Sequence, residues 1–380
     1  MPHPEELKRL NAEIANHMGH LSKSLIYVLA LYVLGMVLVR HSGQSQIAAF
    51  LSRLTGCKFE AMKRRLREVT YEARAKSGQN RQEVDVKKCF APLLGWVLSK
   101  FEGDAKQLVL ALDATYLTDR FIILAVSVVV CGCAIPVAWH IQKSDQKGKW
   151  NPIWITLLRL LHPAIPSDWS VFVLTDSGLY SKKLFQKLDK DFKWQALMRI
   201  HGAQGLFKAK DTRRWLPLRE LVQRGMKPQI LEGRCFKGNP LACTLSMQWE
   251  AEYDQPCLIV TNLRPHQVQH NVYAIRYWIE CGFKDIKRGL FHWEQTKMTC
   301  PQRVERLWLV ISIALLWLTA VGDAAFKKPH WDSLRQARPT GRILSAPVLG
   351  WIELICSLLE GQPLSYGYFN PYSWLPIPEP

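Results

Sequence analysis

The chain has 380 residues, of which 48% are apolar, and this is enough to fill the core of one large domain or of several smaller ones. Its formal net charge is +18 and its pI is near 9.5, with Lys and Arg spread over the whole length. These numbers exclude an intrinsically disordered chain. They favour a polyanionic partner, because Lys and Arg neutralise phosphates and release counterions when nucleic acid binds.

The ten cysteines contain no C-x-x-C pair, and several lie inside apolar runs where a thiol packs like a small hydrophobic group. They indicate reduced thiols and a cytoplasmic protein. Two uncharged stretches, 25–39 and 307–322, are shorter than the ~20 residues that cross a bilayer. We therefore expect two buried core helices and no association with a membrane.

Residues 1–104 are predicted to form a helical domain. An apolar helix ends at Val39, a second covers 44–54, and a third covers 59–76. The third is strongly basic over a turn and a half, at Lys63, Arg64, Arg65 and Arg67. A small helical bundle with one basic helix is typical of proteins that bind a DNA duplex through its phosphates. The alternative is a charged, solvated helix face with no binding role.

From residue 105 the pattern changes to strands. Three successive strands are predicted at 108–112, 121–131 and 134–141. A helix, a strand, a helix and a strand follow, at 150–161, 171–175, 179–188 and 194–200. This order of elements is that of the RNase H-like fold. We therefore assign 105–200 to the first part of an α/β core, in which helices flank a mixed sheet.

Residues 201–271 interrupt this core with a composition rich in Gly, Arg and Lys. Short alternating runs at 233–237, 241–249 and 257–262 predict a β-rich insertion. The second part of the core, 272–325, is helical and contains an apolar helix over 302–321. The C-terminal region, 326–380, ends in a segment rich in Pro, Tyr and Trp, which we expect to form an irregular tail packed on the surface or on a partner chain.

Two aspartates stand at the ends of predicted strands. Asp113 follows the first strand, in the run Asp-Ala-Thr, and Asp176 follows the fourth, in the run Asp-Ser-Gly. Carboxylates at the ends of neighbouring strands of an open sheet meet in one crevice, where they can share a hard cation. Each aspartate taken alone is also an ordinary residue at a strand-to-loop boundary.

The predicted helix 271–288 carries a polar face. Its members recur at steps of three and four residues and, at about 100° per residue, fall within an arc of roughly 80°. They are Tyr273, Arg276, Glu280, Lys284 and Lys287. The neighbouring stripe of Ile279, Phe283 and Ile286 is apolar and would pack the helix on the sheet. The alternative is an i,i+4 ion pair between Glu280 and Lys284 on a solvated face.

Four of these residues form the pattern Y-x(2)-R-x(3)-E-x(6)-K, and the chain resembles the DDE transposases of bacterial insertion sequences at all four positions. The resemblance covers most of the chain. It implies that Asp113, Asp176 and Glu280 are catalytic and hold two Mg²⁺ or Mn²⁺ ions. It also implies that DNA phosphates are bound by side chains of the polar face, namely Tyr273, Arg276, Lys284 and Lys287. In relatives that form a hairpin, a Trp late in the insertion stacks on a flipped base, and Trp249 is the candidate here; it could equally be a strand residue of the insertion core.

The function that this resemblance implies is transposition of an insertion sequence. The protein would bind terminal inverted repeats, cleave the transposon ends and join the freed 3′-hydroxyl to target DNA. We expect a homodimer on double-stranded DNA, because two ends must be brought together, in the cytoplasm of a bacterium and associated with the nucleoid. Two alternatives stay open: an RNase H-like nuclease that cuts without joining, and a catalytically inactive DNA-binding descendant.

Overall fold

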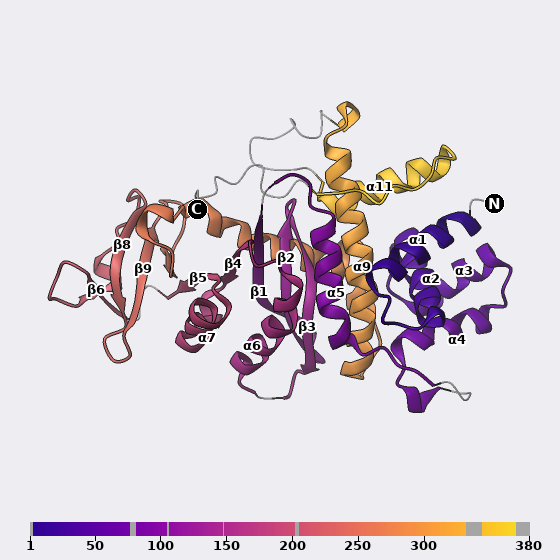
Figure 1. Ribbon diagram of the computed structural model, residues 1–380, viewed down its shortest axis with the longest axis horizontal. Coiled ribbons are helices and arrows are strands. Elements are labelled where there is room, and N and C mark those ends of the chain that lie inside the picture. Colours follow the sequence, from indigo (N-terminus) through magenta and orange to yellow (C-terminus); the bar gives the residue numbers. More distant parts are fainter. Residues whose placement is uncertain are drawn as a thin grey trace.

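A single mixed sheet runs through the protein and carries helices on its faces (Figure 1). The computed structural model describes residues 3–76, 81–104, 106–146, 148–201, 205–331 and 344–369. Within these residues the strands lie in the order β3 (Cys133–Lys143), β2 (Phe121–Val130), β1 (Gln107–Leu117), β4 (Ser170–Thr175), β5 (Gln195–Ile200), β10 (Cys257–Thr261), β9 (Leu241–Gln248), β8 (Gln229–Cys235), β6 (Leu206–Ala209) and β7 (Leu216–Pro217).

The first five strands have the predicted RNase H-like arrangement. β1, β2 and β3 pair antiparallel in sequence order, whereas β1, β4 and β5 run parallel to one another. Every residue of β2 is buried, as expected of a continuous run of β-branched and apolar side chains covered on both faces. The register pairs Leu112 of β1 with Thr175 of β4. This pairing places Asp113 of β1 beside Asp176, which directly follows β4.

The predicted insertion does not form a sheet of its own. β10 pairs antiparallel with β5, and β9, β8, β6 and β7 continue outward from it. The residues 201–271 therefore extend the core sheet (Figure 1). The position of strand β10 in this order places the turn between β9 and β10 at the edge of the sheet where β5 ends.

The long helix α9 (Pro301–Phe326) covers the free edge of β3. The backbone N–H of Ile141 donates to Glu305 Oε1 at 3.0 Å, and Trp139 Nε1 donates to the Glu305 carbonyl at 3.1 Å. By length and hydropathy α9 would pass for a membrane span, but 94% of its most apolar window is buried inside the protein. The expectation of a buried core helix over 307–322 is confirmed.

The N-terminal residues form the predicted helical bundle, with α1 (His3–His17), α2 (Lys23–Val39), α3 (Gln44–Thr55) and α4 (Phe59–Thr70). The apolar helix α2 is buried along most of its length, as predicted. The basic helix α4 ends at Thr70 rather than at Lys76, because Tyr71 adopts an extended backbone and the chain then makes a short 3₁₀ turn. Helix α5 (Val86–Ser99) connects this bundle to β1 (Figure 1).

The remaining helices complete the two faces. α6 (Trp150–Leu161) and α7 (Lys182–Lys187) connect the strands of the core, and α11 (Ala346–Leu359) packs across α9 (Figure 1). The predicted C-terminal tail packs on the protein itself as far as Phe369, whose backbone exchanges hydrogen bonds with Lys100 and Glu102. The rest of that tail, 370–380, lies outside the described residues.

The single predicted helix over 271–288 is wrong. The structure divides this stretch into a 3₁₀ helix (His270–Tyr277), α8 (Trp278–Lys284) and a π-helical turn (Asp285–Gly289). The tight approach of α8 to the sheet is one physical reason, since a Cβ atom on Gly282 would lie 2.5 Å from the carbonyl oxygen of Ala134 in β3. The helix is therefore seated at that glycine, and its two ends depart from regular α geometry.

Candidate active site

Asp176 follows β4 as predicted, whereas Asp113 lies within β1, which continues to Leu117 because it stays paired with β2. Both carboxylates are oriented by the backbone N–H of the next residue. Asp113 Oδ1 accepts the N–H of Ala114 at 2.8 Å, and Asp176 Oδ1 accepts the N–H of Ser177 at 2.7 Å. In both residues the second carboxylate oxygen lies within 4 Å of the guanidinium of Arg276. β1 and β4 are neighbouring parallel strands, roughly 4.8 Å apart. The sheet therefore holds two carboxylates in a fixed, adjacent arrangement.

The third carboxylate comes from α8, and Arg276 joins all three. Its Nη1 lies 3.0 Å from Asp113 Oδ2, and its Nη2 lies 2.8 Å from Glu280 Oε1 and 3.9 Å from Asp176 Oδ2. The side chain of Arg276 is only 11% exposed. Asp113, Asp176 and Glu280 are far apart in the sequence and lie close together in the structure, as predicted. All three lie around the guanidinium group of Arg276.

The 3₁₀ helix explains how Tyr273 and Arg276 reach the sheet together. In a 3₁₀ helix, side chains three residues apart lie directly above one another, whereas in an α-helix they would diverge. The Tyr273 hydroxyl donates to the carbonyl of Thr175 at 2.9 Å, and the residue is 8% exposed. The expected hydrogen bond from Tyr273 to a DNA phosphate stays a prediction, because the hydroxyl is bonded to the protein in this structure. Tyr273 fastens the segment to the end of β4.

Burial and charge shift the ionisation of this cluster. Burial raises the pKa of Asp113, and the adjacent guanidinium of Arg276 opposes that rise. Burial and the neighbouring Arg288 lower the pKa of Lys287, while Glu294 and Asp113 act in the opposite direction. The ammonium group of Lys287 is thus within electrostatic reach of Asp113. The carboxylate cluster lies among cations, as a site for phosphodiesters requires.

The donor set has the chemistry of a magnesium or manganese site. Three carboxylates within reach of one positive charge offer the hard oxygen ligands that these ions prefer. No group of three His, Cys, Asp or Glu among the described residues already has the spacing to hold a metal ion. At this cluster the guanidinium of Arg276 lies within 4 Å of all three carboxylates. Divalent ions fit this donor set if the guanidinium moves aside.

Three further residues with a predicted DNA contact are Lys284, Lys287 and Trp249. Lys284 is exposed and Lys287 is half-buried, on the segment that follows Glu280. Trp249 lies in the turn between β9 and β10, at the edge of the sheet where β5 ends, and its Nε1 donates to the carbonyl of Tyr253 at 2.9 Å. The turn is on the same side of the sheet as Asp176, because β4 and β5 run parallel. Its stacking on a flipped base stays a prediction.

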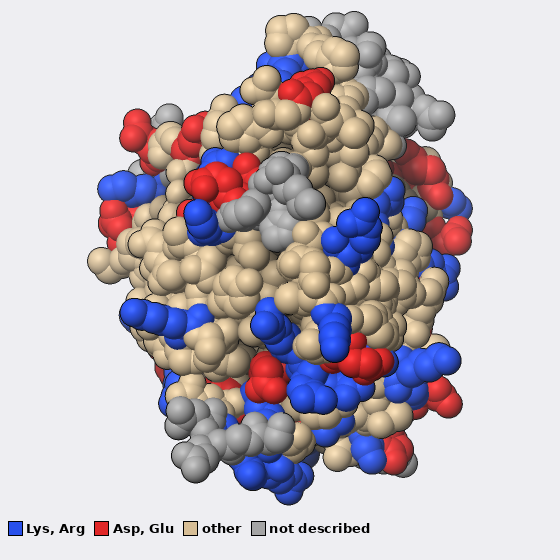
Figure 2. Space-filling model, turned by 90° about the vertical axis from the view of Figure 1, so that its right-hand side faces the viewer, with Lys and Arg blue, Asp and Glu red and all other residues tan. Residues whose placement is uncertain are grey.

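The basic residues of α4 face outward from the N-terminal bundle. Arg64, Arg65 and Arg67 are exposed, and Lys63 is half-buried with its ammonium 5.5 Å from the centre of the Phe59 ring. Figure 2 shows this side of the molecule, with Lys and Arg gathered over the lower part of the surface, at the height of α4 in Figure 1. The structure therefore offers a cationic surface where the sequence predicted one.

The sequence did not predict that two further basic residues lie near Lys63. Lys297 lies before α9 and Arg303 lies in its first turn, and both line one cavity with Lys63. The only signal in the sequence is the run of basic residues around the start of an apolar helix, which is ordinary at helix ends. Their proximity to α4 depends on how the N-terminal bundle docks on the core, and no local pattern records that.

The RNase H-like sheet thus carries Asp113 on β1 and Asp176 after β4, and Glu280 of α8 converges with them on Arg276. A family model described as "Transposase DDE domain" matches residues 127–317, about half of the chain, and the chain belongs to this family. The matched region includes Asp176 and Glu280, and Asp113 lies just before it.

Among solved structures, the chain is similar to one titled "Cryo-EM structure of piggyBac transposase synaptic complex with hairpin DNA (SNHP)". The sequence identity is 11%, the TM-score is 0.40, and the match covers 94% of this chain and 79% of that one. No curated protein matched the chain.

Proposed function

We propose that this protein is the DNA transposase of a bacterial insertion sequence. The observation that carries the proposal is the convergence of Asp113, Asp176 and Glu280 on one guanidinium, in a chain of the DDE transposase family. Its substrates would be double-stranded DNA with terminal inverted repeats, and a target duplex. The basic surface of α4 and the net charge of +18 support a DNA partner.

Two Mg²⁺ or Mn²⁺ ions held by Asp113, Asp176 and Glu280 would activate the attacking oxygen and stabilise the leaving oxygen in phosphoryl transfer. The protein's own residues orient the substrate. Lys284 and Lys287 follow Glu280 on the same segment and can hold phosphates next to the reacting one. Tyr273 fixes the segment to β4, so that Glu280 stays beside the two aspartates.

Arg276 has a part of its own in this scheme. Its guanidinium neutralises three carboxylates that would otherwise repel one another, and this keeps them close together before substrate binds. When it moves aside, the same group can contact a phosphate oxygen, as the resemblance implies. The reaction would start with water at the transposon end and continue with the freed 3′-hydroxyl at the target.

We further propose that the protein works as a homodimer, because two transposon ends must be joined to one target. It would act in the bacterial cytoplasm, in association with the nucleoid. Both statements rest on the proposed reaction.

The test is cleavage of duplexes that carry the inverted repeats flanking the gene. Replacing Asp113, Asp176 or Glu280 by Ala should lower the nicking rate by ~10²–10³-fold or more, the range for loss of one charge-stabilising group at a reaction centre. Binding to the same duplex should stay close to the wild type, since phosphate contacts come from other residues. Glu360→Gln is the matched control, because Glu360 is an exposed carboxylate directly after α11.

Removal of divalent ions should abolish nicking, and Mg²⁺ or Mn²⁺ should restore it. A pre-cut transposon end then separates the alternatives, because a transposase joins its 3′-hydroxyl to a second duplex and a simple nuclease does not. Near-normal cleavage by any one of the three Ala variants would remove that residue from the proposed site.

A further inference from the structure

A cavity of about 700 Å³ lies between the N-terminal bundle and the segment that leads into α9. One wall comes from the start of α3 and from Lys63 and Tyr71 of the α4 region. The opposite wall comes from residues 295–300 and Arg303. The cavity is thus formed by parts of the chain that are more than two hundred residues apart, and it exists only when the bundle is docked.

The walls of this cavity are cationic. Lys63, Lys297 and Arg303 line it, and no Asp or Glu is among its described lining residues. Lys63 and Lys297 form no ion pair with a described residue. Two other cavities in the described part of the chain have carboxylates on their walls, Asp189 and Glu232 in one and Glu68 in the other. The charge of the first cavity therefore fits an anion.

Backbone groups add to this preference. Residues 43–46 line the cavity and form the start of α3, a helix of 12 residues whose N-cap Gly43 makes no side-chain cap. The first N–H groups of a helix have no partner within it, and they carry the positive end of the helix dipole. Phosphate groups are the usual ligands of such an end when cations stand beside it.

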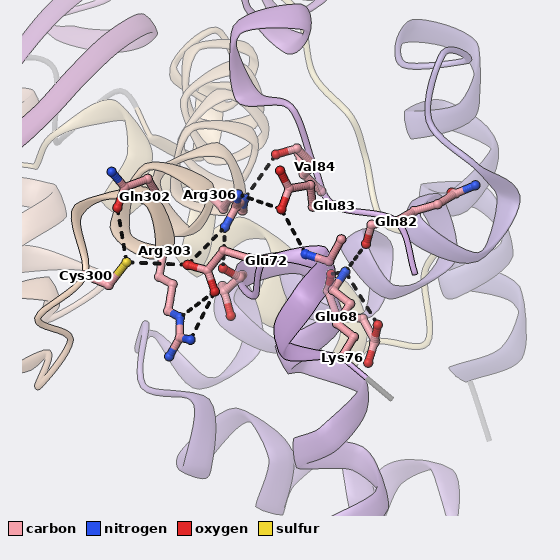
Figure 3. Close-up of polar contacts among 12 residues, drawn as sticks. Glu68, Glu72, Lys76, Gln82, Glu83, Val84, Cys300, Gln302, Arg303 and Arg306 are labelled. Atoms are coloured by element: carbon pink, nitrogen blue, oxygen red, sulfur yellow. Dashed lines mark hydrogen bonds and ion pairs between the residues drawn. The ribbon is translucent and has the colours of Figure 1, made fainter. Parts of the chain in front are cut away.

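A network of charged residues, from the buried Arg306 to the partly exposed Arg303 and Glu83, joins the bundle to α9 (Figure 3). Arg303 Nη2 lies 3.1 Å from Glu72 Oε2, and its guanidinium lies over the ring of Tyr71 at 3.8 Å. Arg306, one turn further along α9, donates to the carbonyls of Thr70 and Val84 at 3.1 Å. These contacts join the chain that follows α4 to the start of α9, and both of these regions contribute residues to the cavity wall.

Two hydrogen bonds link the surroundings of the cavity to segments that carry residues of the carboxylate cluster. Arg120, in the turn after β1, donates to the carbonyl of Met298 in the cavity wall at 3.1 Å. From Asp113 to Leu117, the last residue of β1, the strand advances four residues, or about 13 Å. In the second bond, Arg40 next to the cavity donates to the carbonyl of Gly289 at 2.7 Å, at the end of the turn that contains Lys287.

From these observations we propose that the cavity binds the sugar–phosphate backbone of DNA that flanks the reacting phosphate. Lys63 and Lys297 each contact a phosphate of that backbone. The exposed arginines of α4 continue the cationic surface outward from Lys63, and this favours a long polyanion over a small anion. The inference rests on the proposed function, since it assigns a binding position to the DNA.

The experiment compares the salt dependence of DNA binding in the full chain and in Lys63→Gln/Lys297→Gln. The probe is a short duplex of arbitrary sequence, because phosphate contacts do not depend on sequence. Each lost contact lowers the slope of log K against log salt by about 0.9, so the double variant should lose about 1.8. Its affinity should fall most at low salt.

Two further variants serve as controls. Lys190→Gln/Lys193→Gln removes the same charge from exposed residues at the opposite edge of the sheet, where β5 begins, and should leave the slope unchanged. Lys63→Arg/Lys297→Arg keeps the charge and should keep the slope. A loss of slope in the Arg variant would mean that the lysines act through structure, and that would overturn the inference.

The outcomes separate the two proposals. If the wild type binds the duplex but Lys63→Gln/Lys297→Gln has an unchanged slope, the cavity does not hold DNA phosphates, while the proposed function stands. If the wild type does not bind duplex DNA at all, the DNA partner is wrong and this inference falls with it. If both double Gln variants lose the same slope, the effect is one of net charge and the assigned position is wrong.

Discussion

Replacing Arg306 by Met should uncouple the N-terminal bundle from the catalytic core. Arg306 is 7% exposed, and its Nε and Nη1 donate to the carbonyls of Val84 and Thr70, both at 3.1 Å. Nη1 also lies 3.8 Å from Glu72, and Nη2 lies 3.4 Å from Glu83 (Figure 3). The methionine would fill much of the space but would satisfy none of these acceptors.

The loss of stability can be worked out from the acceptors that would lose their donor, the carbonyls of Val84 and Thr70. Each of the two buried carbonyls that loses its donor costs ~1–3 kcal/mol, whereas Glu72 keeps its ion pair with Arg303 at 3.1 Å. Glu83 is 45% exposed and adds little, because water replaces the lost cation. We therefore expect the free energy of unfolding to fall by about 4 kcal/mol.

Urea unfolding followed by tryptophan fluorescence measures this loss, and the matched control is Arg288→Met. Arg288 also pairs with a carboxylate, Glu294 at 2.7 Å, but its side chain is 76% exposed. Its replacement should leave the unfolding midpoint close to the wild type. The reasoning is refuted if Arg306→Met and Arg288→Met unfold at the same midpoint, since the buried network would then contribute no more than a surface pair.

Three shorter predictions follow. Burial alone would raise the pKa of Glu72, but hydrogen bonds led by Arg303 bring it down from 4.5 to about 2. The stability that Glu72 contributes should thus be complete above pH 4.5 and be lost as the pH falls toward 2, and Glu72→Gln should flatten this part of an acid-unfolding curve. Gly350→Ala should cost about 3 kcal/mol or more, because its Cβ would lie 1.9 Å from the Leu318 carbonyl; thermal unfolding tests it. Tyr273→Phe should destabilise by ~1–3 kcal/mol while leaving the DNA dissociation constant unchanged, and a large loss of affinity would support its phosphate role.

The sequence predicted those parts of the fold that depend on local patterns. The strands at 121–131 and 171–175 are continuous apolar runs, and a run of that kind has few alternatives to a buried strand. Asp113 and Asp176 could be placed together because the sequence predicts a strand before each, and neighbouring parallel strands end on the same side of a sheet. The convergence of Asp113 and Asp176 was therefore predictable without knowing any distance.

The failures have a physical cause in common, which is tertiary packing. A uniform 100° per residue describes only α8, because the segments before and after it adjust to the contacts of Tyr273 and Gly282 with the sheet. The same periodicity placed Tyr273 on a DNA-facing surface, whereas a 3₁₀ turn buries it. The pairing of β10 with β5 and the cavity beside Lys63 depend on long-range docking, for which a single sequence holds no periodic signal.

The pairing of β10 with β5 has a consequence for any attempt to trim the protein. Residues 201–271 look like a removable lobe in the sequence, yet β10 supplies the hydrogen-bonding neighbour of a central strand. In a shortened chain without them, β5 would become an edge strand with unpaired N–H and C=O groups. Strands of other molecules could pair with these groups, and the protein would aggregate. Excision should therefore yield an insoluble protein rather than a minimal enzyme.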